Sequence, residues 1–114
     1  MKFMDVVREI AKEERKYFEN YIYYAKLIKE KAKELLGEAE VYVFGSVVEG
    51  KHTPASDIDV LVVSKNMPKK QSERGRIRAE ILKSIDVFAP FEIHLANEKE
   101  FEWYRRFVKN FVKV

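Results

Sequence analysis

The sequence predicts a small α/β domain of the α+β type, in which a mixed β-sheet carries helices packed on one side. Three observations lead to this prediction. Long segments repeat apolar residues every three or four positions, as amphipathic helices do. Short segments between them are rich in β-branched and aromatic residues, as strands are. The length of 114 residues suits one domain with one hydrophobic core.

Composition narrows the class of protein. Hydrophobic residues make up 46% of the chain and charged residues 36%, with a net charge of +3. These values indicate a folded protein with a surface of mixed sign, so a nucleic-acid partner is not predicted. No apolar run approaches the roughly 18 residues of a membrane span, and the first residues lack a signal peptide, so we expect a cytoplasmic protein. The absence of cysteine excludes disulfides and thiolate metal sites.

Residues 3–36 predict a long N-terminal helix with one apolar stripe. Gly37 follows as a C-cap. A single helix of this length would span about 50 Å, more than so small a domain can cover. Either the helix breaks near residues 12–15, or one end projects and meets another subunit. The stripe consists of Phe3, Val7, Ile10, Tyr17, Tyr21, Ala25, Ile28, Ala32 and Leu35.

The remaining elements follow in order. We expect a strand at 40–44, a loop at 45–56 in which Ser46 can open a short helix, and a strand at 57–64 buried on both faces. A helix at 71–88, a strand at 91–95 and a helix at 98–114 complete the chain. The prediction is thus one domain, residues 1–114, with an N-terminal helical segment (1–37) and a catalytic core (40–114).

The segment VFGSVVEGKHTPASDIDVLVV, residues 43–63, carries the candidate chemistry. Asp57 and Asp59 are two positions apart in a strand, so both carboxylates leave the same face while Ile58 points into the core. Two neighbouring carboxylates suit a divalent cation, and Mg²⁺ is usual where phosphates complete its ligands. Gly45 allows the backbone close to a phosphate, and Ser46 can begin a helix whose N–H groups face the anion.

A third acid is expected if two metal ions take part. In FEIHL, residues 91–95, the apolar side chains face one way and Glu92 and His94 the other. If this strand lies beside 57–64, Glu92 reaches the metal site and helps to deprotonate an attacking hydroxyl. Asp86 is the alternative base. His94 is interpreted as a polar residue of the strand face, and His52 as a loop residue, rather than as ligands.

The spacing of Gly45-Ser46, ten residues and Asp57-Ile58-Asp59 resembles the nucleotidyltransferase superfamily that includes DNA polymerase β. The strand SDIDVLVVS and the segment FEIHLANEKEFEWYRRF are similar to archaeal minimal nucleotidyltransferases. The resemblance implies the nucleotidyltransferase fold and transfer of a nucleoside monophosphate, AMP from ATP, with release of pyrophosphate.

The resemblance also assigns roles and partners. Gly45, Ser46 and Ser56 would bind the nucleotide, and Asp57, Asp59 and Glu92 would be catalytic and would hold two Mg²⁺ ions. Minimal members are often encoded beside a HEPN-domain protein, and some act as antitoxins that adenylylate a tyrosine of that partner. The implied acceptor is therefore a tyrosine of a HEPN-type protein.

One departure from the family pattern leaves an alternative open. Many relatives carry a basic residue between the Gly-Ser pair and the following glycine, where this chain has Glu49. An acid near a triphosphate would weaken binding unless Lys51 or a partner offsets it. The alternative function is a catalytically weak or inactive module that binds nucleotide or a partner of a toxin–antitoxin pair. Under either function, we expect the N-terminal helix to form a contact with a partner or with a second copy of the chain.

Overall fold

The computed structural model describes residues 2–114. Met1, which belongs to the predicted 1–37 segment, lies outside this description, and so do the side chains of residues 11 and 12. The sheet has the order β3-β2-β1-β4, in which β2 and β3 are parallel and the other pairs antiparallel. The predicted mixed sheet with helices is confirmed. The elements are α1 (Phe3–Glu19), α2 (Tyr21–Leu36), β1 (Glu40–Phe44), β2 (Ile58–Val63), α3 (Gln71–Lys83), β3 (Phe91–Ala96), α4 (Glu98–Phe107) and β4 (Val112–Lys113).

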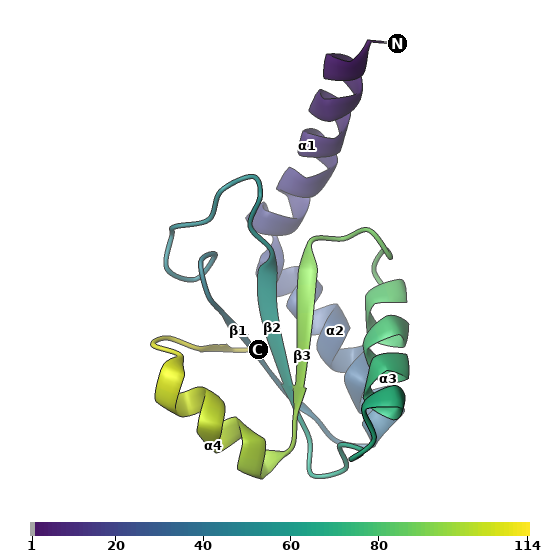
Figure 1. The fold of residues 1–114 in the computed structure, drawn as a ribbon, viewed down its shortest axis with the longest axis vertical. Coiled ribbons are helices and arrows are strands. Elements are labelled where there is room, and N and C mark those ends of the chain that lie inside the picture. The colour runs from purple at the N-terminus through teal and green to yellow at the C-terminus, as the bar shows by residue number, and fades with distance from the viewer. Residues whose placement is uncertain (1) are drawn as a thin grey trace.

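Helices α2 and α3 cover one face of the sheet and form the main core with it (Figure 1). The alternate residues of β2 on this face, Ile58, Val60 and Val62, are completely buried, and so is Ile28 of α2. Burial of an aliphatic side chain of this size contributes about 1.5–3 kcal/mol to the stability of the fold. This face therefore anchors β2, the strand on which the candidate site depends.

Helix α4 packs on the opposite face, which the prediction had left without a helix. Its side chains Phe101 and Tyr104 pack over a second apolar cluster around Leu61, Val63 and Ala96. The helix begins there because Asn97, directly after β3, forms a capping box with Glu100. The alternation in FEIHLA predicted a polar face for β3. The apolar side chains of α4 nevertheless pack on this face, over the C-terminal ends of β2 and β3.

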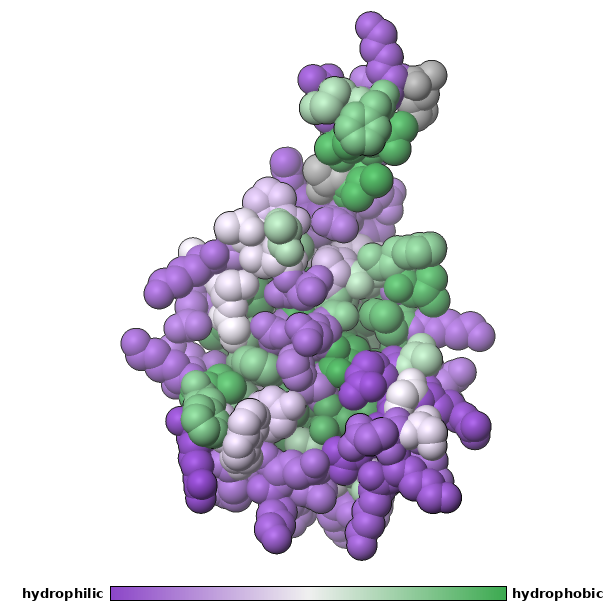
Figure 2. Space-filling model, in the orientation of Figure 1, coloured by the Kyte–Doolittle hydropathy of each residue, from purple (hydrophilic) through white to green (hydrophobic). Residues whose placement is uncertain are grey.

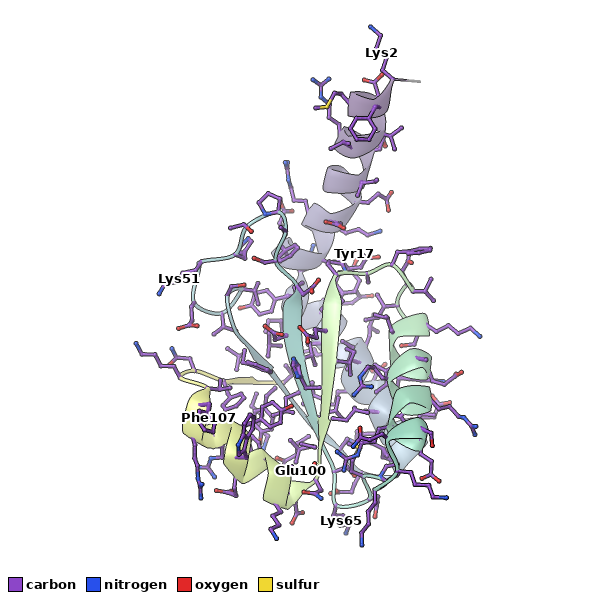
Figure 3. The ribbon with its side chains drawn as sticks, in the orientation of Figure 1. Lys2, Tyr17, Lys51, Lys65, Glu100 and Phe107 are labelled. Atoms are coloured by element: carbon purple, nitrogen blue, oxygen red, sulfur yellow. The ribbon has the colours of Figure 1, made fainter. Side chains whose placement is uncertain are left out.

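The N-terminal helical segment breaks at Asn20, not near residues 12–15. The side-chain amide of Asn20 donates a hydrogen bond to the carbonyl oxygen of Lys16, 2.9 Å away, where α1 ends. Helix α1 then projects from the body and gives the molecule a length of 48 Å (Figure 1). Its last turn is anchored by the buried ring of Tyr17 at the junction with the body (Figure 3). Among the described helices, none has both the length and the apolar character needed to cross a bilayer.

The C-terminal segment also differs from the prediction. Helix α4 ends at Phe107, and Val112–Lys113 form β4 against Tyr42 and Val43 of β1. The helical spacing of the aromatic residues continues to Phe111, but pairing with β1 satisfies backbone groups that a longer helix would leave without partners on that strand. Similarly, α3 ends at Lys83, and the predicted helix at Ser46 is a series of turns.

Two arginines of α3 bind the free edge of β3. Arg78 donates from Nε to the carbonyl oxygen of Ile93, at 2.8 Å, and Arg74 donates from Nη1 to that of Leu95, at 3.4 Å. Arg74 is buried and also pairs with Glu100 through both terminal nitrogens, at 2.9 and 3.1 Å. This pair connects α3, on one side of the sheet, to α4 on the other.

Candidate active site

Three side chains with metal-ligating atoms meet where β2 and β3 begin. Asp59, Glu92 and His94 each offer one ligand atom, and these atoms all lie within 4.8 Å of one another. Nε2 of His94 is 3.1 Å from Oδ1 of Asp59 and 3.9 Å from Oε1 of Glu92. The side chains of Asp59 and His94 are about one quarter exposed, and that of Glu92 is 57% exposed. The cluster is therefore open to solvent and to a ligand on its Glu92 side.

Sheet register explains why these residues meet. Asp59 of β2 lies directly beside Glu92 of the parallel strand β3. Because side chains alternate along a strand, both carboxylates leave the face opposite the main core, and His94, two positions after Glu92, leaves the same face. The sequence prediction that Glu92 would lie beside Asp59 depended on this pairing, and the structure contains it.

Gly45 lies directly against the carboxylate of Asp59. A Cβ atom at position 45 would overlap the Asp59 side chain, and the backbone of Gly45 has a φ of +84°, which favours glycine. The residue comes immediately after β1, whose last residue, Phe44, pairs with Asp59. The glycine of the Gly-Ser pair is thus required for the position of Asp59 as well as for close approach of a ligand to the backbone.

Tyr104 fixes the other side of the His94 ring. Its hydroxyl is 3.4 Å from Nδ1 of His94, and the two rings meet edge to face at 5.8 Å. Burial is the main cause that raises the pKa of Tyr104 above its usual value, so its hydroxyl is neutral and can donate or accept a hydrogen bond. The capping box at Asn97 and Glu100 sets the start of α4, and Tyr104 is one turn further along the same face.

The other predicted site residues, Asp57, Ser46 and Ser56, are not part of the three-residue cluster. Asp57 precedes β2 and is exposed. Ser46 is half-buried in the turn after Gly45, and its carbonyl accepts a hydrogen bond from the N–H of Lys51. Ser56 is engaged in its own loop, where its hydroxyl accepts the backbone N–H of Thr53 at 2.9 Å. The structure thus brings Asp59, Glu92 and Gly45 together, but not Asp57 or Ser56.

Two further sequence predictions concern charge near the site. Glu49, in the loop after Gly45, has an exposed side chain. Asp86, the alternative base, lies in the connection between α3 and β3, where its carboxylate accepts the N–H of Phe88 at 2.9 Å. It is a lining residue of a hollow against α1, away from the cluster.

His94 is the residue that sequence reasoning missed. The available signal was its position two residues after Glu92, on the same strand face, in a strand that pairs with the Asp59 strand. A histidine at such a position is usually a solvated surface residue, and only the fold shows that α4 covers it and that Tyr104 meets its second nitrogen.

A hollow of about 460 Å³ adjoins the cluster along the edge of β3, between α3 and α4. Glu92, His94 and Tyr104 line one side of it, and Arg78 and Gln71 line the other. The cluster therefore opens onto a space that is large enough for part of a substrate and that contains both acidic and basic groups.

The donor set fits a divalent cation. Two neighbouring carboxylates repel each other when both are ionised, and a cation between them removes this repulsion and uses their oxygens as ligands. Solvent exposure on the Glu92 side leaves room for ligands from a substrate or from water. Asp59 and Glu92 are the residues that would hold such an ion.

Comparisons with known proteins agree with this geometry. A family model described as a nucleotidyltransferase domain matches residues 25–113. A protein of Methanocaldococcus jannaschii named "Putative protein adenylyltransferase MJ1305" is 33% identical over 55 residues, which are 46% of this chain and 37% of that protein. The chain therefore matches little more than one third of the length of this relative.

Two crystal structures have the same fold. One, of a protein described as a "putative nucleotidyltransferase", is 34% identical with a TM-score of 0.64, and the match covers 78% of this chain and 95% of the other. A second, from Sulfolobus solfataricus and described in the same words, is 28% identical with a TM-score of 0.51, covering 81% and 79%. Since the family model covers most of the chain, including β1, β2 and β3 with their acidic cluster, the chain belongs to the nucleotidyltransferase domain family.

Proposed function

We propose that this protein transfers AMP from ATP to a hydroxyl group of another protein, in a reaction that depends on Mg²⁺. One observation carries the proposal: Asp59 and Glu92 lie side by side at the start of parallel strands, with the backbone of Gly45 directly against Asp59. In a nucleotidyltransferase domain this arrangement suits a metal-bound triphosphate. The name of the Methanocaldococcus jannaschii relative supports a protein as the acceptor and an adenylyl group as the group transferred.

The reaction joins an acceptor hydroxyl oxygen to the α-phosphorus of ATP. As this bond forms, the bond from the α-phosphorus to the bridging oxygen breaks and pyrophosphate leaves. Glu92, the more exposed acid of the cluster, accepts the proton of the attacking hydroxyl. The divalent metal, when bound, supplies positive charge to the phosphate oxygens and to the attacking oxygen.

Other residues of the site would bind the metal ions and the triphosphate. Asp59 and Glu92 would hold a first metal ion, and Asp57 would join Asp59 in holding a second. Asp57 is exposed and directly precedes β2, so it can turn toward a ligand without breaking strand pairs. Gly45 and Ser46 approach the phosphates through their backbone, and Ser56 would contribute if its bond to Thr53 opened.

The acceptor is proposed to be a tyrosine of a HEPN-type partner, which would make this protein an antitoxin. The exposed apolar residues of α1 support binding to a partner. Phe3 is 79% exposed and Ile10 53%, and apolar side chains gather on the projecting end of α1 (Figure 2). This helix lies outside the residues that match the family model, so it adds to the catalytic domain a surface through which an acceptor protein or a second copy can be held.

A second candidate function is partner binding without turnover. Glu49 carries a negative charge in the exposed loop after Gly45, where a triphosphate would approach. If this charge excludes ATP, the protein would act through α1 alone, by covering a functional surface of its partner.

One experiment separates the two functions. The protein is incubated with α-³²P-labelled ATP, Mg²⁺ and the product of the neighbouring gene, and the labelled residue is identified by mass spectrometry. Label on a tyrosine of the partner supports AMP transfer. A stable complex with no label, at ATP concentrations up to the millimolar range, would favour the binding module.

A further inference from the structure

We propose that His94 is a metal ligand of this site, through Nε2, and that it makes the site bind Mn²⁺ in preference to Mg²⁺. The inference rests on the proposed function in one respect, since it takes the acidic cluster to be a metal site. It goes beyond the three carboxylates that the sequence motif predicts, because it adds a nitrogen ligand and a selectivity between ions.

The position of Nε2 is the first argument. This atom lies 3.1 Å from a carboxylate oxygen of Asp59 and 3.9 Å from one of Glu92, so it occupies the same small space as the two acidic ligands. Ligand atoms that surround one cation are separated by similar distances, since metal–ligand bonds are about 2.0–2.2 Å long. A cation bound by both Asp59 and Glu92 would therefore meet Nε2 of His94 as well.

The surroundings of the ring give the second argument. His94 is held by the Tyr104 hydroxyl at Nδ1 and by the ring of Phe44, whose centre is 5.2 Å away. Metal-ligating histidines usually donate their second ring N–H to such a partner, which fixes the tautomer and the ring orientation. When a cation is bound between the acids, a proton on Nδ1, donated to the Tyr104 oxygen, would leave the Nε2 lone pair of His94 free for the metal. Because Tyr104 is neutral, its oxygen can accept this hydrogen bond.

The chemistry of the donors gives the selectivity. Mg²⁺ prefers oxygen ligands, whereas imidazole suits the later first-row metals such as Fe, Ni, Cu and Zn. Mn²⁺ shares the oxygen ligands of Mg²⁺ and also accepts nitrogen, so a site with two carboxylates and one imidazole should favour it. We therefore expect Mn²⁺ to bind more tightly than Mg²⁺ at this site.

The competing explanation is that His94 only forms an ion pair or hydrogen bond with Asp59. In that case a cation would displace the histidine or would leave it outside its ligand set, and metal preference would not depend on residue 94. The two explanations differ in whether nitrogen is bonded to the metal, which can be measured without any assay of transfer.

The test uses the full chain, with Mn²⁺ alone and with Mn²⁺ and a non-hydrolysable ATP analogue. Electron spin-echo spectroscopy of bound Mn²⁺ should show the coupling of a directly bonded ¹⁴N nucleus, which changes to that of ¹⁵N when histidine is labelled. His94→Asn should remove this coupling and weaken Mn²⁺ binding at least about tenfold while changing Mg²⁺ binding less. Calorimetry measures both affinities.

Two further variants complete the test, and the first of them is a matched control. The chain has two histidines. The second, His52, lies in the loop after β1, and its ring stacks on the ring of Phe18 in α1, with ring centres 4.9 Å apart. His52→Asn should leave the nitrogen coupling and the ion preference unchanged. Tyr104→Phe removes only the hydroxyl beside Nδ1 and should weaken Mn²⁺ binding by about tenfold while the coupling remains.

The outcomes separate this inference from the function on which it rests. Bound Mn²⁺ without nitrogen coupling, or an ion preference unchanged in His94→Asn, overturns the role of His94 and leaves the proposed transferase intact. No binding of either ion, with or without the nucleotide, overturns both. A circular-dichroism melt of each variant identifies any loss of folding, and in that event His94→Gln takes the place of His94→Asn.

Discussion

The two faces of the sheet use the same strands for different purposes. On one face, Ile58, Val60 and Val62 of β2 are fully buried under α2 and α3. On the other, the same strand presents Asp59 at its start and Leu61 and Val63 further along, where α4 covers them. One face is thus apolar from end to end, whereas the other is apolar only as far as α4 reaches and is charged beyond it.

The difference teaches how so small a domain supports a charged site. Asp59 and Glu92 lie side by side, and two ionised carboxylates at this separation repel each other. The face under α2 and α3, which we call the closed face, holds β2 and β3 in register despite this repulsion. The face that carries the acidic cluster is the open face. Mutations on the closed face should therefore lower the stability of the fold, whereas mutations of the acidic cluster should lower the rate of transfer.

The largest effect is expected for Asp59→Asn, on the open face. Loss of one ligand charge removes the metal, and with it both charge stabilisation and positioning of the triphosphate, so AMP transfer should fall by about 10⁴-fold or more. The melting temperature should stay the same or rise, because a repulsive charge is removed. Transfer from labelled ATP and a thermal melt measure the two quantities. A strong loss of stability would contradict the division between the faces.

Glu92→Gln should have the next largest effect. The substitution keeps the shape of the side chain and removes its basicity, and loss of a general base costs about 10²–10⁴-fold in rate. ATP binding should persist, since Asp57 and Asp59, the proposed ligands of the second metal ion, and the Gly45-Ser46 turn remain to hold the triphosphate. Single-turnover kinetics and calorimetry with ATP distinguish the two steps. Transfer at the wild-type rate would show that another group accepts the proton.

Ile58→Val is the matched change on the closed face, next to Asp59 in the sequence. Ile58 is completely buried, so removal of one methylene should lower the free energy of unfolding by about 0.5–1.5 kcal/mol. The rate of transfer should change less than about twofold, because the register of β2 and β3 is kept. Urea denaturation and the same transfer assay provide both values. A large loss of activity at full folding would mean that the faces are not independent.

The smallest effect concerns the pH dependence of stability, which arises from the Arg74–Glu100 pair between α3 and α4. The hydrogen bond from Arg74 lowers the pKa of Glu100 below its ordinary value of 4.5. A lowered folded pKa means that this stabilisation is fully present above the ordinary value and is lost as the pH falls through the folded one. Because the Glu100 side chain is 44% exposed, solvent screening limits the loss to about 1 kcal/mol.

Urea denaturation between pH 6 and pH 3, compared with Glu100→Gln, measures this effect. The wild-type protein should lose more stability over the interval than the variant, which has no carboxylate to protonate at position 100. Equal slopes for the two proteins would show that the pair adds nothing to the connection between α3 and α4.

The sequence predicts the core of this molecule well because its strands carry strong patterns. The apolar run after Asp59 indicated a doubly covered strand, and alternation in FEIHL placed Glu92 on the polar face. The break at Asn20 and the strand Val112–Lys113 were missed, since each depends on tertiary contacts. Tyr17 packs against Phe91, with ring centres 5.8 Å apart, and the two residues of β4 pair with residues 69 and 71 positions earlier. His94 was missed for the same reason, because its neighbour Tyr104 comes from α4.

The two arginines on the edge of β3 have a consequence for assembly. An edge strand offers a row of backbone groups to which a strand of another molecule can add, and this is a common route to aggregation. Here the outward carbonyl groups of Ile93 and Leu95 already accept hydrogen bonds from Arg78 and Arg74. Since β4 at the opposite edge is only two residues long, neither edge offers a long free template. Both edges of the sheet are therefore poor templates for strand addition between molecules.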